Sequence, residues 1–271
     1  MTNRLMPTGV FPQLAAISFF VIACAGNVWS QQIRVEISNY LYRSVLKAEY
    51  QASQNTAVHV ITINVGDDGI IKNIGDSLFD RLEYPSKLDI TEGDSVLHLT
   101  RTSTTPSHKS VQSKLDITWR DDLLKYSKGG DAKERLELRV FPEGSTICEG
   151  DQVSLSKLSD GTLVEAGFGF NKDGITRKYA NGRVLLYYKG TQNSRFDIKG
   201  KSGQFIIDYY TDMGDGWEKG GPAIKISGGG LNSSDRRKSV INYLILQAYD
   251  IFLPGLLMPA LFDAPLGSDP S

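Results

Sequence analysis

RVLLYYKGTQNSRFDIKGKSGQFIIDYY, residues 183–210, contains three runs in which apolar and polar residues alternate. It closes a longer stretch, Glu134–Tyr210, that repeats the same pattern. A period of two predicts β-strands with one buried and one hydrated face. The residues expected on shared faces are Leu136, Leu138 and Val140, then Val164, Ala166, Phe168 and Phe170, then Val184, Leu186 and Tyr188, then Phe196 and Ile198, and finally Phe205, Ile207 and Tyr209.

Glycine turns separate these runs. They are Asp160-Gly161, Asp173-Gly174, Asn181-Gly182 and the loop Gly200–Gly203. Asx-Gly pairs supply the positive φ angles that tight hairpins need. The stretch therefore predicts an antiparallel meander.

The flanking sequence extends this pattern and adds two helices. Strands are expected near residues 33–37, 58–65, 95–101 and 113–119, and Asp67-Asp68-Gly69 marks the first hairpin turn. Leu41, Val45, Ala48 and Ala52 have helical spacing. The sequence predicts a mainly β protein, an antiparallel meander forming a sandwich or a partly open barrel, with an N-terminal helix and an apolar C-terminal helix packed on the sheet.

The expected C-terminal helix begins near Arg236, after the capping sequence 232–235, and Pro254 ends it. Its residues from Val240 to Phe252 are apolar except for a narrow polar stripe, so we expect it to be largely buried. The stripe consists of Ser239, Asn242, Gln247 and Asp250. Residues 214–230 are rich in glycine, and the glycines from Gly220 to Gly230 are expected to form a flexible lead-in to this helix.

The chain has 271 residues, 40% hydrophobic and 23% charged, enough for a full core. We expect a signal peptide at 1–23, or 1–30 if cleavage is later. We then expect the first helix and hairpins at 31–128, the meander and C-terminal helix at 129–253, and a tail at 254–271. The middle parts are expected to form one continuous domain, since only the Gly129-Gly130 loop separates them.

The N-terminus has the features of an export signal. Arg4 precedes an apolar stretch, Val10–Ala25, that is shorter than a membrane span needs. Ala23-Cys24-Ala25 allows cleavage before Gly26, and Val28-Trp29-Ser30 before Gln31. Val21-Ile22-Ala23-Cys24 instead resembles the lipobox of bacterial lipoproteins, which implies a lipidated Cys24. The chain is thus expected either on the periplasmic face of a membrane, as a lipoprotein, or free in the periplasm or medium.

Composition limits the partners and the chemistry. A net charge of −1 excludes a general attraction to nucleic acid. Once Cys24 is removed or lipidated, Cys148 has no disulfide partner, and we expect a half-buried strand thiol. His59, His98 and His108 lack ligand partners at metal spacing, so no metal site and no cofactor is predicted.

Gly75-Asp76-Ser77-Leu78 matches the tetrapeptide after which GDSL-type (SGNH) hydrolases are named. The resemblance implies a nucleophilic Ser77. That family also uses a late Asp-x-x-His, whereas no histidine follows His108 here. A turn at the end of a strand is the other interpretation of these four residues.

Asp212-Met213-Gly214-Asp215-Gly216-Trp217 resembles the Asp-box turn of sialidases and other propeller proteins. The resemblance implies a structural turn and a link to carbohydrate-handling proteins. The acidic pairs Asp67-Asp68 and Asp121-Asp122 do not meet the need of glycosidases for two facing carboxylates.

Two functions follow from these patterns. We expect a non-catalytic, exported envelope protein, either a structural protein or one that binds a lipid, another apolar ligand or an envelope protein. A lipid would lie between the sheet and the C-terminal helix. The alternative is an enzyme, either a hydrolase that uses Ser77 or a carbohydrate-active enzyme with carboxylates not yet located.

Overall fold

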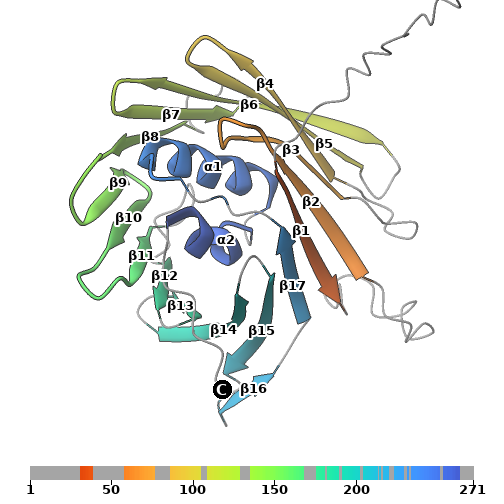
Figure 1. Ribbon diagram of the computed structural model, residues 1–271, viewed down its shortest axis with the longest axis vertical. Helices are drawn as coiled ribbons and strands as arrows, with labels where there is room; N and C mark the ends of the chain where they lie inside the picture. Colours follow the sequence, from red (N-terminus) through yellow and green to blue (C-terminus); the bar gives the residue numbers. More distant parts are fainter. Residues whose placement is uncertain are drawn as a thin grey trace, which may run out of the picture.

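A computed structural model gives the fold (Figure 1). It describes residues 31–38, 58–76, 86–104, 109–128, 135–167, 175–180, 182–188, 191–201, 204–212, 214, 216–219, 223–228, 231, 233–250 and 253–262. The expected signal segment with Cys24, the expected helix at 41–52, Ser77 and His108 all lie outside these residues.

The described chain is mainly β, as predicted, and its seventeen strands belong to one antiparallel sheet. The strands are β1 (Gln31–Ser38), β2 (Val58–Val65), β3 (Ile71–Asp76), β4 (Ser86–Gly93), β5 (Val96–Thr104), β6 (Ser110–Arg120), β7 (Leu123–Lys128), β8 (Arg135–Val140), β9 (Thr146–Gly150), β10 (Ser154–Lys157), β11 (Leu163–Ala166), β12 (Ile175–Ala180), β13 (Arg183–Tyr188), β14 (Thr191–Lys201), β15 (Gln204–Asp212), β16 (Trp217–Lys219) and β17 (Ala223–Gly228).

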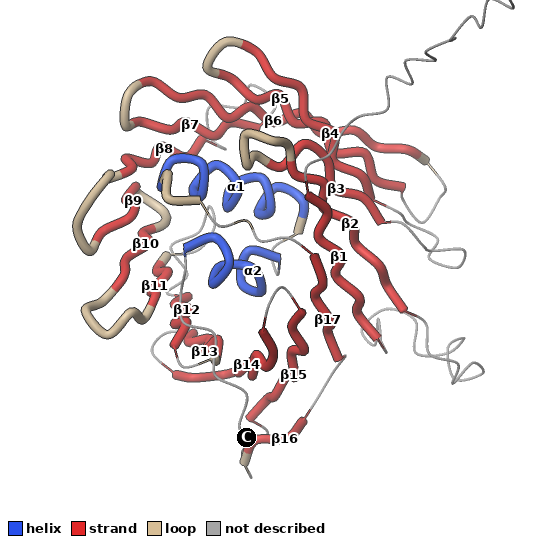
Figure 2. Tube along the Cα trace, viewed as in Figure 1, coloured by secondary structure: helices blue, strands red, loops and turns tan. Residues whose placement is uncertain are grey.

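The sheet closes into a barrel (Figure 2). Each strand from β1 to β15 pairs with the next, β17 pairs with β15, and β17 also pairs with β1. Sixteen strands therefore form a complete ring, and β16 pairs with β15 alone. Of the two expected architectures, the structure has the barrel, and it is fully closed, so each of the sixteen described strands of the ring has a neighbour on both sides.

Strand β17 corrects one expectation, because it lies in the residues expected to form a flexible lead-in to the C-terminal helix. Ile224 and Ile226 are buried and alternate with Lys225 and Ser227. Gly228 has φ 124°, and a Cβ there would overlap the carbonyl oxygen of Gln32 on β1. Glycine is thus needed where the ring closes.

The barrel wall is apolar inside and polar outside, as the alternation predicts. Ile33, Val35 and Ile37 of β1 are buried, whereas Arg34 and Glu36 form an ion pair on the outer face. The inward residues face one another across each strand pair. They include Ile63, Ile74, Leu88, Leu99, Ile117, Leu124, Leu138, Cys148, Leu155, Leu163, Tyr179, Val184, Ile198 and Ile207.

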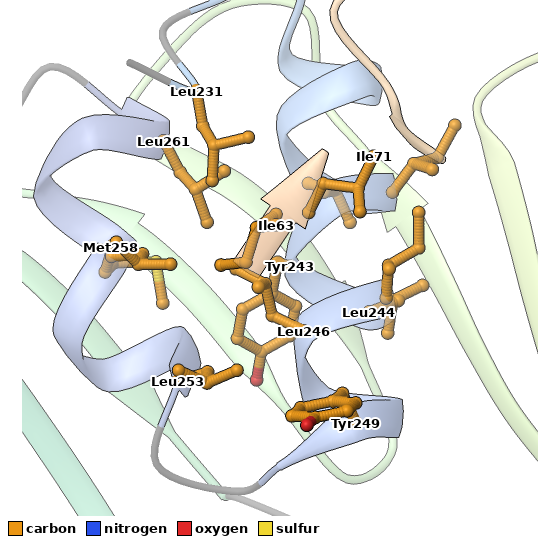
Figure 3. Packing of buried hydrophobic residues seen from close by; sticks show 14 of the residues in the cluster. Ile63, Ile71, Leu231, Tyr243, Leu244, Leu246, Tyr249, Leu253, Met258 and Leu261 are labelled. Carbon is orange, nitrogen blue, oxygen red and sulfur yellow. The ribbon is translucent and has the colours of Figure 1, made fainter. Parts of the chain in front are cut away.

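Two helices lie inside the ring, α1 (Arg236–Tyr249) and α2 (Leu253–Phe262) (Figure 1). Asp235 caps α1 by accepting a hydrogen bond from the amide of Arg237. Figure 3 shows side chains of both helices packed together with Ile63 and Ile71 of the wall. The helices thus supply the centre of the core.

Helix α1 is largely buried, as expected, but only part of its polar stripe reaches water. Ser239 and Asn242 are fully buried, whereas Gln247 and Asp250 are partly exposed. The Asn242 side chain accepts a hydrogen bond from the amide of Ile71 and donates one to the carbonyl of Gly69. Asn242 thus satisfies backbone groups of the β2–β3 turn instead of water.

The start of α1 is fastened to two hairpin turns. Lys238 donates to the carbonyl of Asp68, in the β2–β3 turn. Arg236 donates to the carbonyls of Phe141, Gly144 and Thr146, around the β8–β9 turn. These side chains hold α1 across the ring.

The segment expected to be a tail from residue 254 contains α2. Helix α1 ends at Tyr249 with Asp250 as its C-cap, and Pro254 is the second residue of α2. Proline is tolerated in a first helical turn because its missing N–H has no partner there. Pro254 therefore lies in the first turn of a new helix, five residues beyond the end of α1, and does not itself end α1.

Candidate functional site: a charged cluster on the inner wall

One ion pair lies inside the barrel. Glu165 of β11 and Arg177 of β12 are directly opposed in the strand register. Their side chains are 0% and 6% exposed, and Arg177 Nη1 lies 3.1 Å from Glu165 Oε2 and 3.3 Å from Oε1. Burying two charges costs several kcal/mol per ion unless the geometry compensates. This pair therefore requires further polar partners.

Two tyrosine hydroxyls complete the shell of Glu165. Tyr179 of β12 donates to Oε2 at 3.2 Å, and Tyr243 of α1 donates to Oε1 at 3.0 Å. Each carboxylate oxygen thus receives one phenolic and one guanidinium hydrogen bond. The cluster joins two wall strands to the central helix.

The sequence predicts the strand that carries Glu165, but it does not reveal the residues that bond to Glu165. We expected Val164 and Ala166 on the buried face of their strand, whereas Leu163 and Glu165 are the inward residues. Leu163-Val164-Glu165-Ala166 mixes apolar residues on both faces, so alternation alone could not choose between the two registers. The signal that was missed is a glutamate and an arginine on neighbouring strands of one hairpin.

Burial and mutual attraction set the ionisation of the cluster. Burial lowers the pKa of Arg177 and is the largest single influence on it, but the charge of Glu165 together with Tyr179 and Tyr243 outweighs burial and leaves the pKa raised. Burial raises the pKa of Tyr179 and Tyr243 well above the ordinary phenol value, and the negative charge of Glu165 adds to the effect. Both phenols therefore stay protonated and act as donors.

Cys148 lies on the same inner wall, on β9. It is fully buried, so the expectation of a half-buried thiol is corrected. Burial raises its pKa to about 12, with a smaller contribution from the charge of Glu165. A thiol this hard to ionise is a poor nucleophile.

The end of the cluster that faces α2 meets a glycine. A Cβ built on Gly255 would lie 3.8 Å from the Tyr179 hydroxyl and 3.9 Å from Nε and Cδ of Arg177. Gly255 itself contributes no side chain at this point, so the backbone of α2 approaches the polar cluster here.

The tetrapeptide that contains Ser77 begins on β3. Gly75 pairs with Lys87 of β4, whereas His98 pairs with Thr91, four residues further along β4. Four residues of strand span about 13 Å. His98 Nδ1 lies 2.7 Å from Asp116 Oδ1, and both side chains are about half exposed. The strand register thus places the His98–Asp116 pair and Gly75 at different heights along the sheet.

The turn that resembles an Asp-box connects β15 to β16. Asp212 accepts a hydrogen bond from the amide of Gly214. Trp217 is 36% exposed, and the guanidinium of Arg195 lies 5.3 Å from its ring centre and 4.5 Å from that of Tyr210. The aromatic rings of this outer patch are thus contacted by a cation of the wall itself.

Carboxylates of the described residues do not gather into a metal site. No group of three or more His, Cys, Asp or Glu side chains there could hold a metal ion. Asp208, outside the ring, is bound by Lys219 at 2.6 Å and by Lys199 at 3.6 Å, and Lys219 is the main cause of its lowered pKa. Asp67–Asp68 and Asp121–Asp122 each lie in a hairpin turn.

Comparisons with known proteins give no relative: no family model, no curated protein and no solved structure matches the chain. In the part of the chain that the structure describes, no helix combines the length and the apolar character that crossing a membrane requires.

Proposed function

We propose that this chain is an exported, non-catalytic protein of the cell envelope that binds a lipid or similar apolar ligand between the barrel wall and the C-terminal helices. The observation that carries the proposal is the apolar inner wall, lined from β1 to β17 by buried aliphatic side chains. A ligand with an acyl chain would gain about 25 cal/mol for each Å² of apolar surface buried there.

The chemistry of the inner wall favours binding over catalysis. Its ionic pair is fully hydrogen-bonded, and its thiol is protonated at neutral pH. A nucleophile needs an adjacent general base. The described partners of the ion pair and of the Cys148 thiol include no such base.

The N-terminal sequence supports export. Lipidation of Cys24 would place the barrel at a membrane surface, next to a source of acyl ligands. Mass spectrometry of the mature N-terminus would test this part. A diacylated Cys24 is the anchored outcome, a free Gly26 or Gln31 is the unanchored one, and an intact Met1 in the envelope fraction would contradict processing altogether.

Ligand binding is tested on the purified full-length protein. Organic extraction followed by mass spectrometry identifies any lipid carried from the host. Native mass spectrometry with added monoolein, oleate and oleylamine then tests the three head-group charges. A one-to-one complex with at least one of these lipids is expected. Absence of both carried and added lipid would contradict the proposal and leave a structural role, or an envelope protein as the partner.

A further inference from the structure

One part of the outer wall presents apolar side chains to solvent. It is formed by β14, β15, β16 and β17, which are neighbours in the sheet (Figure 1). Ile206 of β15 is 49% exposed and Trp217 of β16 is 36% exposed, and both belong to the few large hydrophobic side chains that are exposed in the described chain. Tyr210 lies between them on the outer side of β15. Exposed apolar groups that share a face mark a surface that a partner covers.

Cations flank these apolar side chains. The strand register places a cation on each side of two of them, with Lys199 and Lys225 opposite Ile206, and Arg195 and Lys219 opposite Tyr210. The guanidinium of Arg195 also lies over the rings of Tyr210 and Trp217. We call this surface the basic face, defined by Arg195, Lys199, Ile206, Trp217, Lys219 and Lys225.

The carboxylates of the basic face lie below its cations or at its end. The side chains of Asp197 and Asp208 are 16% and 11% exposed, whereas Lys199 and Lys219, which bind Asp208, are 50% and 58% exposed. Asp212 is exposed but lies at the end of β15, where it bonds to a turn amide. Positive charge therefore predominates at this surface, although the whole chain carries a net charge of −1.

We propose that the basic face docks on a membrane surface that contains anionic lipids. Its lysines and Arg195 lie against the lipid phosphates, and Trp217 and Ile206 enter the head-group region. Basic residues are attracted to anionic lipid heads, and tryptophan and tyrosine prefer the interface between lipid and water. A soluble polyanion would pair with the cations but leave Ile206 in water. This inference goes beyond the proposed function, because it concerns the outer wall and needs no ligand inside the barrel.

The N-terminal segment leads to the same side of the barrel. Strand β17 pairs with β1, and Cys24 precedes Gln31, the first residue of β1, by seven residues. Seven extended residues reach about 25 Å at most. A lipidated Cys24 would therefore keep β1 and β17 close to the membrane that holds the lipid. The basic face would then be a second contact with that membrane.

Vesicle co-sedimentation of the purified full-length protein tests the proposal. The protein carries Cys24→Ser, so that no acyl anchor contributes, and Trp29→Phe, so that the N-terminal tryptophan gives no signal. The vesicles consist of phosphatidylcholine alone or of equal parts of phosphatidylcholine and phosphatidylglycerol. We expect binding to the anionic vesicles, with affinity more than about tenfold higher than to phosphatidylcholine, and a loss of this preference at about 1 M salt.

Two lysine pairs locate the contact. Lys199→Gln/Lys225→Gln removes two cations of the basic face and should weaken binding to the anionic vesicles about thirtyfold, since each basic residue near such a surface contributes about 1 kcal/mol. Lys87→Gln/Lys114→Gln is the matched control. It removes the same charge from exposed positions on β4 and β6, on the opposite side of the ring (Figure 1). Binding of the control should change less than about threefold.

Tryptophan fluorescence tests the apolar part of the contact. Brominated phosphatidylcholine in the anionic vesicles quenches a tryptophan that enters the bilayer. Trp217→Phe should abolish most of this quenching. Trp119→Phe should keep it, because Trp119 packs against the core inside the barrel. Quenching that survives in Trp217→Phe would mean that another surface enters the membrane, and would overturn the proposal.

The remaining outcomes are equally decisive. Absence of binding to the anionic vesicles, equal binding to both kinds of vesicle, or equal losses in the two lysine pairs would overturn the proposal. Binding of dextran sulfate without binding of vesicles would assign the basic face to a soluble polyanion and would overturn it as well. A barrel that carries and takes up no lipid would contradict the proposed function alone, because vesicle docking is measured separately.

Discussion

At the scale of single residues, Glu165 decides how the barrel and its central helix fit together. Its carboxylate accepts hydrogen bonds from Arg177, Tyr179 and Tyr243, which come from the wall and from α1. A misplaced α1 would leave a buried charge without one of its donors. We infer that the cluster fixes the position of α1, as buried polar groups do in other cores.

Breaking the ion pair from one side should cost more than removing it. Glu165→Gln leaves the guanidinium of Arg177 buried without a counter-charge, and we expect a loss of about 3–5 kcal/mol in the free energy of unfolding. The double variant Glu165→Gln/Arg177→Met leaves no charge and should recover part of that loss. Urea denaturation measures both. A double variant less stable than the single one would contradict this account.

Cys148 predicts a loss of stability in alkali. Its pKa is raised from 9.0 to about 12 in the folded protein, so folding holds a proton that the unfolded chain releases. The stabilisation is complete below about pH 9 and is lost as the pH rises toward 12. The buried phenols of Tyr179 and Tyr243 act in the same direction above about pH 10.

Cys148→Ala should therefore flatten the decline of unfolding free energy between pH 9 and pH 10, where the thiol titrates before the phenols. Urea denaturation across this pH range makes the comparison. The variant will be less stable overall because it leaves a small cavity. A decline as steep as in the wild type would mean that the thiol ionises freely.

At the scale of elements, polar side chains of α1 form hydrogen bonds with hairpin turns. The helical pattern of the sequence would place these side chains in water. Asn242 satisfies the amide of Ile71 and the carbonyl of Gly69 in a buried place. Gln247 on the same helix has a buried Oε1 with no hydrogen-bond partner. We therefore expect the Asn242 side chain to stabilise the fold and the buried oxygen of Gln247 to destabilise it.

Asn242→Leu is expected to lower the unfolding free energy by about 1–3 kcal/mol, because it leaves the buried amide of Ile71 without a partner and removes the bond to the partly buried carbonyl of Gly69. Gln247→Leu, the matched control, removes an unsatisfied oxygen and should be near neutral or stabilising. Thermal or urea unfolding of both variants decides it. Equal losses would show that amide packing, and not hydrogen bonding, sets the cost.

The elements also show how far the sequence could lead. Strands with clean alternation, such as Leu136–Val140 and Phe196–Ile198, were predicted on the correct face because burial on one side imposes a period of two. Strand β17 was missed because the glycines on either side of it conceal the two isoleucines. Residues 254–262 were assigned to the tail because Pro254 and Pro259 hid a helix that only surrounding packing can stabilise.

At the scale of the whole molecule, closure of the ring depends on pairings between distant parts of the chain. Strand β17 joins β1, nearly two hundred residues earlier in the chain, and local patterns carry no information on such pairings. The partners of Glu165 were beyond prediction for the same reason, because Tyr243 reaches it from 78 residues away. The fold class and the buried faces of cleanly alternating strands were thus predictable, but closure and the inner cluster were not.

Closure can be tested at the seam between β17 and β1. Gly228→Ala should destabilise the protein through both its φ of 124° and the overlap with Gln32. Gly216→Ala is the control, since Gly216 has φ 127° but open space around it. Strain at such a φ costs about 1–3 kcal/mol. In urea denaturation, Gly228→Ala should lower the unfolding free energy by more than about 1 kcal/mol beyond the loss caused by Gly216→Ala. Equal losses would contradict close packing of β17 against β1.

The central claim is that the protein's own two C-terminal helices fill the closed barrel. Hydrogen–deuterium exchange of the full-length protein tests it most directly. The amides of 236–249 and of 253–262 should both be protected, because both helices are buried inside the ring. Rapid exchange throughout either helix in the folded protein would contradict the account.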